Sequence, residues 1–309
     1  MTGQSRKAKI GLALGSGSAR GWSHIGVINA LAKAGIEPDI VCGCSIGGLV
    51  GASYAAGNLK ELECWARSLS RIDVARLLNF SMNGFVDVER LQSFILQYVG
   101  DETLNIETIE KTFATVATDL ETGREVWFTE GSLVEAVWSS ISLPGVFPPV
   151  RSQNRWLIDG GLVNPVPVSL CRALGADHVI AVNLNGDIVG KHFYQERQKS
   201  EPLVEEHDVA EGFAENITKA LREYSSRLFG SNGKLRVPGF FDTLASSINI
   251  TQDRITRSRM AGDPPDITLT PKLSHLGLLE FFRAEEAIAE GEDCVVRMMP
   301  QLQHFLHGD

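Results

Sequence analysis

The sequence is short of basic residues, of paired cysteines and of long apolar runs, and each shortage excludes a class of protein. Its 309 residues include 29 Lys and Arg against 38 Asp and Glu, a formal net charge of −9. Nucleic-acid binding normally needs a basic excess, and an anionic membrane surface would repel this chain except at a local basic patch. With 43% hydrophobic and 22% charged residues, the chain has the composition and length of an ordinary globular protein with a sizeable core.

The five cysteines predict neither a disulfide framework nor a metal site. Their number is odd, and Cys42 and Cys44 have no second pair at metal-ligand spacing. Such usage is typical of buried, reduced thiols. The apolar run at 10–14, after three basic residues, is too short for the core of a signal peptide. We therefore expect a cytoplasmic protein, with peripheral contact to the inner face of the membrane left open.

One stretch, 40–59, contains no charged residue and is long enough to span a bilayer. It also contains five glycines and two serines, so it favours a buried strand, a sharp turn and a helix over a membrane span. The turn is predicted at Ser45, with the helix starting near Gly47. A serine on such a turn presents its hydroxyl at the sheet edge, and Gly43 and Gly47 leave room where strand and helix cross.

Alternating strand and helix patterns predict an α/β fold, a three-layer sandwich with a mostly parallel central sheet and a helix-rich C-terminal extension. We expect residues 8–185 to form the α/β domain, and residues 186–309 to form a helix-rich region packed on it. The predicted strands are 9–14, 40–42, 113–118, 125–129, 156–158, 178–184 and 267–269. The first predicted helix spans 22–34 and the second starts near Gly47. The later ones are 59–70, 86–99, 133–141, 165–174, 208–229, 243–260 and 278–296. A charged loop is expected over 191–207.

Three motifs in chain order point to one kind of chemistry. The loop after the first strand offers the backbone N–H groups of Gly17 and Ser18 ahead of a helix, and such donors suit an oxyanion hole. Ser45 supplies a nucleophile, and Asp159, on a Gly-Gly turn after a strand, can take its proton. An aspartate with an ordinary pKa of about 3.9 is a weak base for serine, so a partly apolar site is expected to raise its basicity.

These residues resemble the patatin-like phospholipases, a family of lipid acyl hydrolases, over about residues 8–185. The matching motifs are Ser16-Gly17-Ser18-Ala19-Arg20-Gly21, Gly43-Cys44-Ser45-Ile46-Gly47 and Asp159-Gly160-Gly161. The resemblance implies a phospholipase A or lysophospholipase-type carboxylic ester hydrolase with a Ser45–Asp159 dyad. It also implies no catalytic histidine, no metal and no cofactor. The implied partner is a lipid or other acyl-ester substrate, met by peripheral membrane contact; the oligomeric state stays open.

The supporting loop departs from the family at two positions. The family usually has glycine where this chain has Ser16 and Ser18, and a serine held at positive φ costs about 1–2 kcal/mol. The backbone donors survive this change. Arg20, followed by Gly21, is expected to fix the loop, meet a lipid phosphate or pair with a carboxylate.

A Ser–His–Asp esterase is the first alternative. His178, His207 and His275 all follow Asp159, so the order Ser, Asp, His is formally present, and His24 lies just after the glycine-rich loop.

Two further alternatives belong to other classes. Gly15 and Gly17 partly match a dinucleotide-binding fingerprint, although Arg20 stands at its sixth position and Glu37 or Asp39 only loosely meets the ribose distance. The last alternative is a non-catalytic protein of the same fold that acts as a regulator or a scaffold.

Side chains for the lipid itself are also predicted. Val146, Phe147 and Trp156 are candidates for an acyl site, although ordinary core packing is the favoured interpretation of each residue taken singly. Arg254, Arg257 and Arg259 are candidates for phosphate headgroups, with a solvated helix face as the simpler interpretation.

Overall fold

The computed structural model describes residues 8–77, 88–101, 103–188 and 240–307. Its centre is a sheet of eight strands in the order β5-β6-β3-β2-β1-β7-β8, with β4 paired to β3. The strands are β1 (Ile10–Leu14), β2 (Ile40–Cys44), β3 (Thr112–Asp119), β4 (Glu125–Phe128), β5 (Val150–Ser152), β6 (Arg155–Asp159), β7 (His178–Val182) and β8 (Ile267–Leu269). Pairs among β3, β2, β1, β7 and β8 are parallel, and the pairs that join β4, β5 and β6 are antiparallel.

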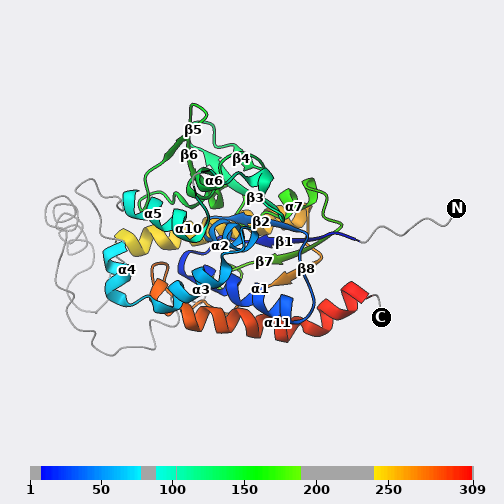
Figure 1. Ribbon diagram of the computed structural model, residues 1–309. Coiled ribbons are helices and arrows are strands. Elements are labelled where there is room, and N and C mark those ends of the chain that lie inside the picture. Colours follow the sequence, from blue (N-terminus) through cyan, green and yellow to red (C-terminus); the bar gives the residue numbers. More distant parts are fainter. Residues whose placement is uncertain (1–7, 78–87, 102, 189–239, 308–309) are drawn as a thin grey trace, which may run out of the picture.

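Helices cover both faces of this sheet (Figure 1). They are α1 (Ser23–Lys33), α2 (Ile46–Ala55), α3 (Leu59–Ser68), α4 (Arg71–Leu77), α5 (Val88–Tyr98), α6 (Leu133–Ile141), α7 (Val168–Ala173), α10 (Phe240–Gly262) and α11 (Ala284–His307). Short 3-10 helices are η1 (Ser18–Trp22), η2 (Ile106–Thr108), η3 (Gly160–Leu162) and η4 (Phe281–Arg283). The predicted three-layer α/β sandwich with a mostly parallel sheet and a helical C-terminal part is confirmed.

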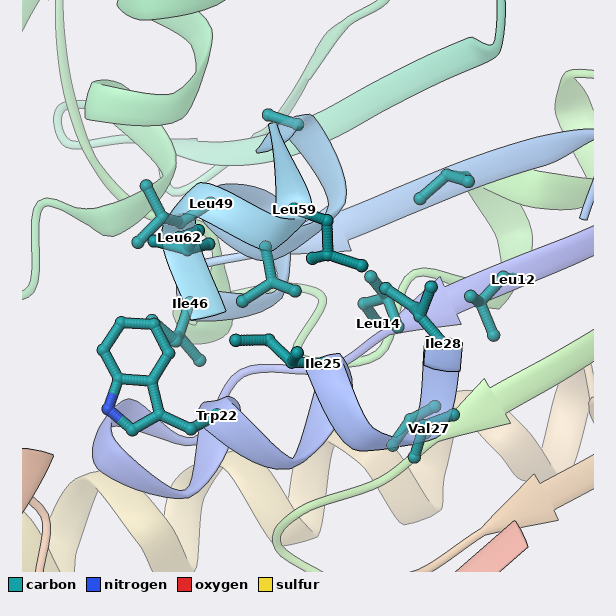
Figure 2. Close-up of a cluster of buried hydrophobic side chains, with 14 of the residues drawn as sticks. Leu12, Leu14, Trp22, Ile25, Val27, Ile28, Ile46, Leu49, Leu59 and Leu62 are labelled. Atoms are coloured by element: carbon teal, nitrogen blue, oxygen red, sulfur yellow. The ribbon is translucent and has the colours of Figure 1, made fainter. Parts of the chain in front are cut away.

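Alternation along the strands divides the core into two layers. On β1, Leu12 and Leu14 pack with α1, α2, α3, α6 and α11, whereas Ala13 packs with α7 and the end of α10. Figure 2 shows the first layer, where side chains from β1, α1, α2 and α3 converge. Several strand residues that face the second layer are small, among them Ala13, Ala114 and Ala181. A β-carbon on Gly11 would lie 3.0 Å from the Cys171 β-carbon, so α7 lies close against the sheet. Period-two alternation with both faces apolar is what a buried parallel strand requires.

The C-terminal part contributes to the same sheet and the same core. β8 pairs with β7 through Ile180–Ile267, and α11 packs closely along α1. At this crossing a β-carbon on Gly26 would lie 1.9 Å from the Ile288 carbonyl oxygen, and one on Gly291 would lie 2.1 Å from that of Ser23. Both glycines therefore permit the two helices to touch through their backbones.

Several predicted elements need correction. Strand β5 was not predicted, and the last helix begins at Ala284 and continues to His307 through Pro300, whereas the sequence predicts 278–296. The helix continues because one side of its last turns packs on the protein: Leu302 is inaccessible and Phe305 packs edge-on against His178. The predicted helix 208–229 and the loop 191–207 lie outside the described residues. Among the described residues, no helix combines the length and the apolar character needed to cross a bilayer.

Candidate active site

Ser45 stands between β2 and α2 at the carboxyl edge of the sheet. Its backbone adopts φ 55° and ψ −126°, a region that L-residues rarely occupy and that is found where a turn holds a functional side chain. Its N–H donates to the hydroxyl of Ser140 on α6 over 2.9 Å, and that hydroxyl lies 2.9 Å from Thr115 Oγ1 on β3. Neighbouring elements thus fix the turn, and the Ser45 side chain is half-buried.

The two glycines that flank Ser45 are required by the same turn. A β-carbon on Gly43 would lie 2.3 Å from the carbonyl oxygen of Gly47, and one on Gly47 would lie 2.2 Å from that of Leu14. These clashes would be with backbone atoms, which cannot rotate away. The glycines therefore allow the helix to start directly above the end of the strand.

The register of β3 brings Asp159 to Ser45. Strand β3 lies between β2 and β6. Its Val116 pairs with Cys44 of β2 on one edge, and the next residue, Ala117, pairs with Asp159 of β6 on the other edge. The antiparallel strand β6 thus ends where β2 ends. Ser45 Oγ donates a hydrogen bond of 2.5 Å to Asp159 Oδ2. The structure therefore brings together the two side chains that were predicted to meet.

Asp159 is fully buried, and this burial changes its acidity. Its exposed fraction is 0%, and burial raises the pKa of its carboxyl from 3.8 to about 6, against the opposing effect of its hydrogen bonds from Ser45 and the Gly161 N–H. The Gly161 bond, 2.7 Å long, holds the second carboxyl oxygen. A carboxylate with a pKa near 6 is a better proton acceptor than an exposed one and is still ionised at neutral pH.

None of the alternative histidines that the structure describes is placed to complete a Ser–His–Asp triad. His24 is buried with Nε2 2.7 Å from the Gly15 carbonyl oxygen, and burial lowers its pKa to about 4. His178 begins β7, at the sheet end opposite Ser45, and His275 is paired with Glu286 near the surface. His207 lies outside the described residues.

The loop between β1 and η1 lies beside Ser45. Ser18 lines the same pocket as Ser45, and within the described parts of the chain no acceptor is paired with the N–H groups of Gly17 and Ser18. Of the two serines in this loop, Ser18 has a positive φ of 51°, whereas Ser16 does not. The strain expected for serine therefore applies at Ser18 alone.

Arg20 supports this loop from inside the protein. It is 2% exposed; its Nε donates to the Gly17 carbonyl oxygen over 3.1 Å and its Nη2 to Asn249 Oδ1 over 2.9 Å. Burial lowers its pKa to about 10, so it stays charged at neutral pH. Of the three predicted roles, the contacts fit loop fixation. Gly21 is the position where Arg20's helix meets α2, since a β-carbon there would lie 2.3 Å from Ile46 side-chain atoms.

An apolar pocket opens from Ser45. Besides Ser18 and Ser45, it is lined by Trp22, Ile46, Leu49, Trp65, Leu69, Val74, Phe94, Ile141, Leu143, Val146, Phe147, Leu279 and Phe281. The Trp22 indole N–H donates to the Phe281 carbonyl oxygen, which leaves an apolar wall. Val146 and Phe147, predicted for an acyl site, line the pocket. Trp156, predicted with them, does not; it is 43% exposed on β6.

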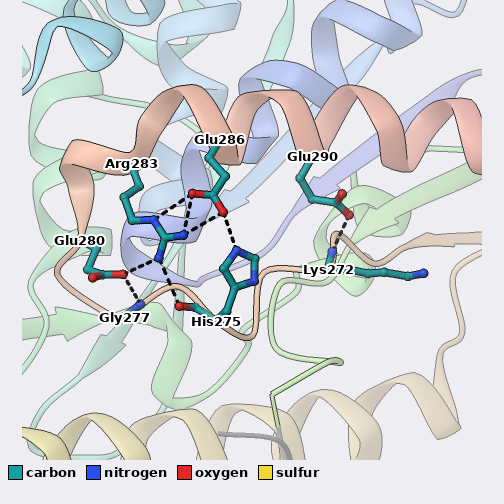
Figure 3. A network of polar contacts seen from close by, with 7 residues as sticks. All are labelled: Lys272, His275, Gly277, Glu280, Arg283, Glu286 and Glu290. Atoms are coloured by element: carbon teal, nitrogen blue, oxygen red, sulfur yellow. Dashed lines mark hydrogen bonds and ion pairs between the residues drawn. The ribbon is translucent and has the colours of Figure 1, made fainter. Parts of the chain in front are cut away.

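The pocket residues Leu279 and Phe281 lie on the segment that leads into α11. A network of ion pairs and hydrogen bonds holds this segment in place (Figure 3). Arg283 bonds Glu286 through Nε, 2.9 Å, and Glu280 through Nη1, 3.0 Å. His275 Nε2 lies 2.6 Å from Glu286 Oε1. These contacts fix both ends of the pocket wall against α11.

The remaining sequence hypotheses find less support. Asp39 precedes β2 and bonds the Ile10 N–H, at the sheet end opposite the glycine-rich loop, so the dinucleotide fingerprint lacks its acidic partner there. Arg259 pairs with Glu125, and Arg257 with Asp253, which leaves a headgroup role only for the exposed Arg254. Across the described ranges, no group of three His, Cys, Asp or Glu side chains is placed to hold a metal ion. The absence of metal and cofactor stays a prediction.

Residues that sequence reasoning missed come from distant elements. Ser140 bonds the Ser45 amide, and Asn249 and Gln252 of α10 bond Arg20 and Ser16. Their only signal was polar residues within amphipathic helices, a pattern that normally indicates a solvated face.

Comparisons with known proteins show the family of this chain. A family model described as patatin-like phospholipase matches residues 12–172. An uncharacterized NTE family protein of Mycobacterium tuberculosis is 32% identical over 327 residues, which cover 93% of this chain and 90% of that protein. The human patatin-like phospholipase domain-containing protein 6 is 34% identical over 183 residues, 57% of this chain and 13% of that protein. A lysophospholipase of Aspergillus fumigatus is 33% identical over 183 residues, 57% of this chain and 12% of that protein.

Among solved structures, VipD from Legionella pneumophila is similar, with a TM-score of 0.45 and 13% identity over 96% of this chain and 67% of that chain. The family model covers more than half of the chain, and the mycobacterial relative aligns along nearly all of both proteins. The chain therefore belongs to the patatin-like phospholipase family, whose activity class is lipid hydrolysis.

Proposed function

We propose that the protein is a phospholipase A or lysophospholipase-type carboxylic ester hydrolase in which Ser45 is the nucleophile and Asp159 the base. The hydrogen bond of 2.5 Å from Ser45 Oγ to the buried Asp159 carboxylate carries this proposal. A serine hydroxyl beside a carboxylate of raised pKa, at the mouth of an apolar pocket, suits attack on the ester of a fatty acyl chain.

The reaction is proposed to proceed through an acyl-enzyme. Ser45 Oγ bonds to the ester carbon while its proton passes to Asp159, and the Gly17 and Ser18 N–H groups stabilise the negative charge on the carbonyl oxygen. Collapse breaks the bond to the alcohol, which takes the proton from Asp159. Water, deprotonated by the same carboxylate, then releases the fatty acid and restores Ser45.

The apolar lining of the pocket supports recognition of the substrate through its acyl chain. Because each buried methylene contributes about 0.8 kcal/mol, we expect kcat/KM to rise roughly fourfold per methylene from acetyl to medium-chain p-nitrophenyl esters until the pocket is filled. Val146→Thr, which adds a hydroxyl to the wall, should flatten this rise. The same substitution at the exposed Val296 of α11 should not.

A panel of phospholipids, lysophospholipids and soluble esters tests the proposed function. Release of fatty acid from lipids supports it. Turnover of soluble esters without any lipid hydrolysis would indicate a general serine esterase. No turnover and no labelling of Ser45 by a fluorophosphonate would favour the non-catalytic alternative.

The acidity of Asp159 predicts a pH profile. Only the ionised carboxylate accepts the Ser45 proton, so kcat/KM should rise with pH and level off above the Asp159 pKa of about 6. Below that value it should fall about tenfold per pH unit. Chromatographic detection of the product between pH 4.5 and 8, with circular dichroism at each pH to verify folding, measures this limb. A profile that is flat through pH 6 would contradict Asp159 as the base.

A further inference from the structure

Helix α10 contacts the active site through one of its faces, although it lies outside the residues that the family model matches. Asn249, Gln252 and Arg259 are three and seven residues apart and so share that face. Asn249 bonds Arg20, Gln252 bonds Ser16, and Arg259 Nε donates to the Val163 carbonyl oxygen over 2.9 Å. One helix thereby contacts both residues 16–20, which contain the proposed Gly17 and Ser18 donors and are called the oxyanion loop below, and the segment after Asp159.

Asn249 acts on the oxyanion loop through Arg20. The Gly17 carbonyl oxygen accepts hydrogen bonds from Arg20 Nε, 3.1 Å, and from the Arg20 N–H, 3.3 Å. In a planar trans peptide the carbonyl and the following N–H point in opposite directions. Holding the Gly17 carbonyl toward Arg20 therefore directs the Ser18 N–H away from Arg20, and Ser18 is a residue that lines the pocket. Asn249, itself 8% exposed, holds the far end of Arg20.

Gln252 contacts both the oxyanion loop and the turn that follows Asp159. Its Oε1 accepts hydrogen bonds of 3.0 Å from Ser16 Oγ and 3.0 Å from Asn185 Nδ2, and all three side chains are buried. Its Nε2 is packed against Gly161, where a β-carbon would lie 2.4 Å from it. Gly161 in turn donates its N–H to Asp159. A shift of Gln252 would therefore displace both the oxyanion loop and the turn that holds the Asp159 carboxylate.

This contact also gives the serine at position 16 a structural role, because its hydroxyl donates to Gln252. Glycine has no hydroxyl to donate, so Gln252 Oε1 would lose one of its two buried donors. A buried acceptor that loses a partner is destabilised. Ser16 and Gln252 therefore form a matched pair of this chain, separated by 236 residues.

We propose that Asn249 and Gln252 are positioning residues that set the geometry of the Gly17–Ser18 donors and of the Asp159 turn. The proposal rests on the function proposed above. Misplacement of a preorganised donor lowers the rate of the chemical step more than substrate binding.

Steady-state kinetics on a soluble ester, using the full chain, tests the proposal. Asn249→Leu and Gln252→Met should each lower kcat by about 10- to 100-fold with little change in KM. Asn249→Asp keeps an oxygen acceptor for Arg20 and should recover most of the loss. Thr251→Ala, on the exposed side of the same helix, is the matched control and should behave as wild type.

A double-mutant cycle tests whether Gln252 acts through Ser16. Ser16→Ala combined with Gln252→Met should lose little more than Gln252→Met alone, because both remove the same bond. Additive losses would overturn the pairing. If Gln252→Met does not fold, Ser16→Gly removes the bond from the other side and should show the same split between kcat and KM.

Hydrogen exchange separates this proposal from the proposed function, because it needs no turnover. Asn249→Leu should speed amide exchange in residues 16–22 and leave the core strands unchanged, even if the wild type hydrolyses no ester. Unchanged exchange in 16–22, unchanged kcat, or a loss that Asn249→Asp does not recover would overturn the positioning roles.

Discussion

Ser45→Ala is expected to lower kcat for acyl-ester hydrolysis by about 10⁴- to 10⁶-fold, the range seen when a serine hydrolase loses its nucleophile. Alanine retains the β-carbon and the backbone strain at φ 55°, so the substitution removes little besides the hydroxyl. The Ser45 N–H bond to Ser140 also remains. The loss should therefore appear in kcat and not in the fold.

A matched substitution separates this effect from general damage. Ser258→Ala, at an exposed position on α10, should keep wild-type kcat. Fluorophosphonate treatment followed by peptide mass spectrometry should modify Ser45 in the wild type and leave the Ser45→Ala variant unmodified. Turnover by Ser45→Ala within tenfold of wild type would remove Ser45 from the proposed mechanism.

The sequence allowed the motif residues to be singled out, because each proposed chemical role is tied to local backbone. A strand, a serine and a helix within a few residues define the turn at Ser45, and the Gly-Gly turn defines Asp159. The contact between Ser45 and Asp159, however, depends on residues far apart in the sequence. It follows from the register of β3, which pairs Val116 with Cys44 and Ala117 with Asp159. No periodicity in the sequence encodes which strands are neighbours.

The supporting residues could not be predicted for a related reason. Gln252 and Asn249 lie on a helix whose polar residues suggested solvent exposure, yet both are buried against Ser16 and Arg20. Arg259 suggested a headgroup contact and instead pairs with Glu125. A polar side chain on an amphipathic helix becomes a structural contact only when another element covers it, and that depends on the tertiary fold.

Asp159→Asn is expected to lower kcat by about 10³- to 10⁴-fold and, at the same time, to stabilise the protein. Asparagine retains an oxygen for the Gly161 N–H and is nearly isosteric, but it cannot accept the Ser45 proton. The stabilisation follows from burial. The ionised carboxylate, 0% exposed, is held in the folded protein against a desolvation penalty that the unfolded chain does not have.

The sign of the pH dependence separates this effect from an ordinary change in packing. The Asp159 pKa is 3.8 without burial and about 6 in the folded protein, so between these values the folded state binds more protons and its stability falls as pH rises. At pH 7 the ionised group costs about 3 kcal/mol at most, taking about 1.36 kcal/mol per pKa unit. Urea unfolding should therefore show Asp159→Asn more stable than wild type by about 1–3 kcal/mol at pH 7, with the gap closing toward pH 4. A variant less stable than wild type at pH 7 would mean that the carboxylate is stabilised by its surroundings, and the raised pKa on which its role as a base depends would be wrong.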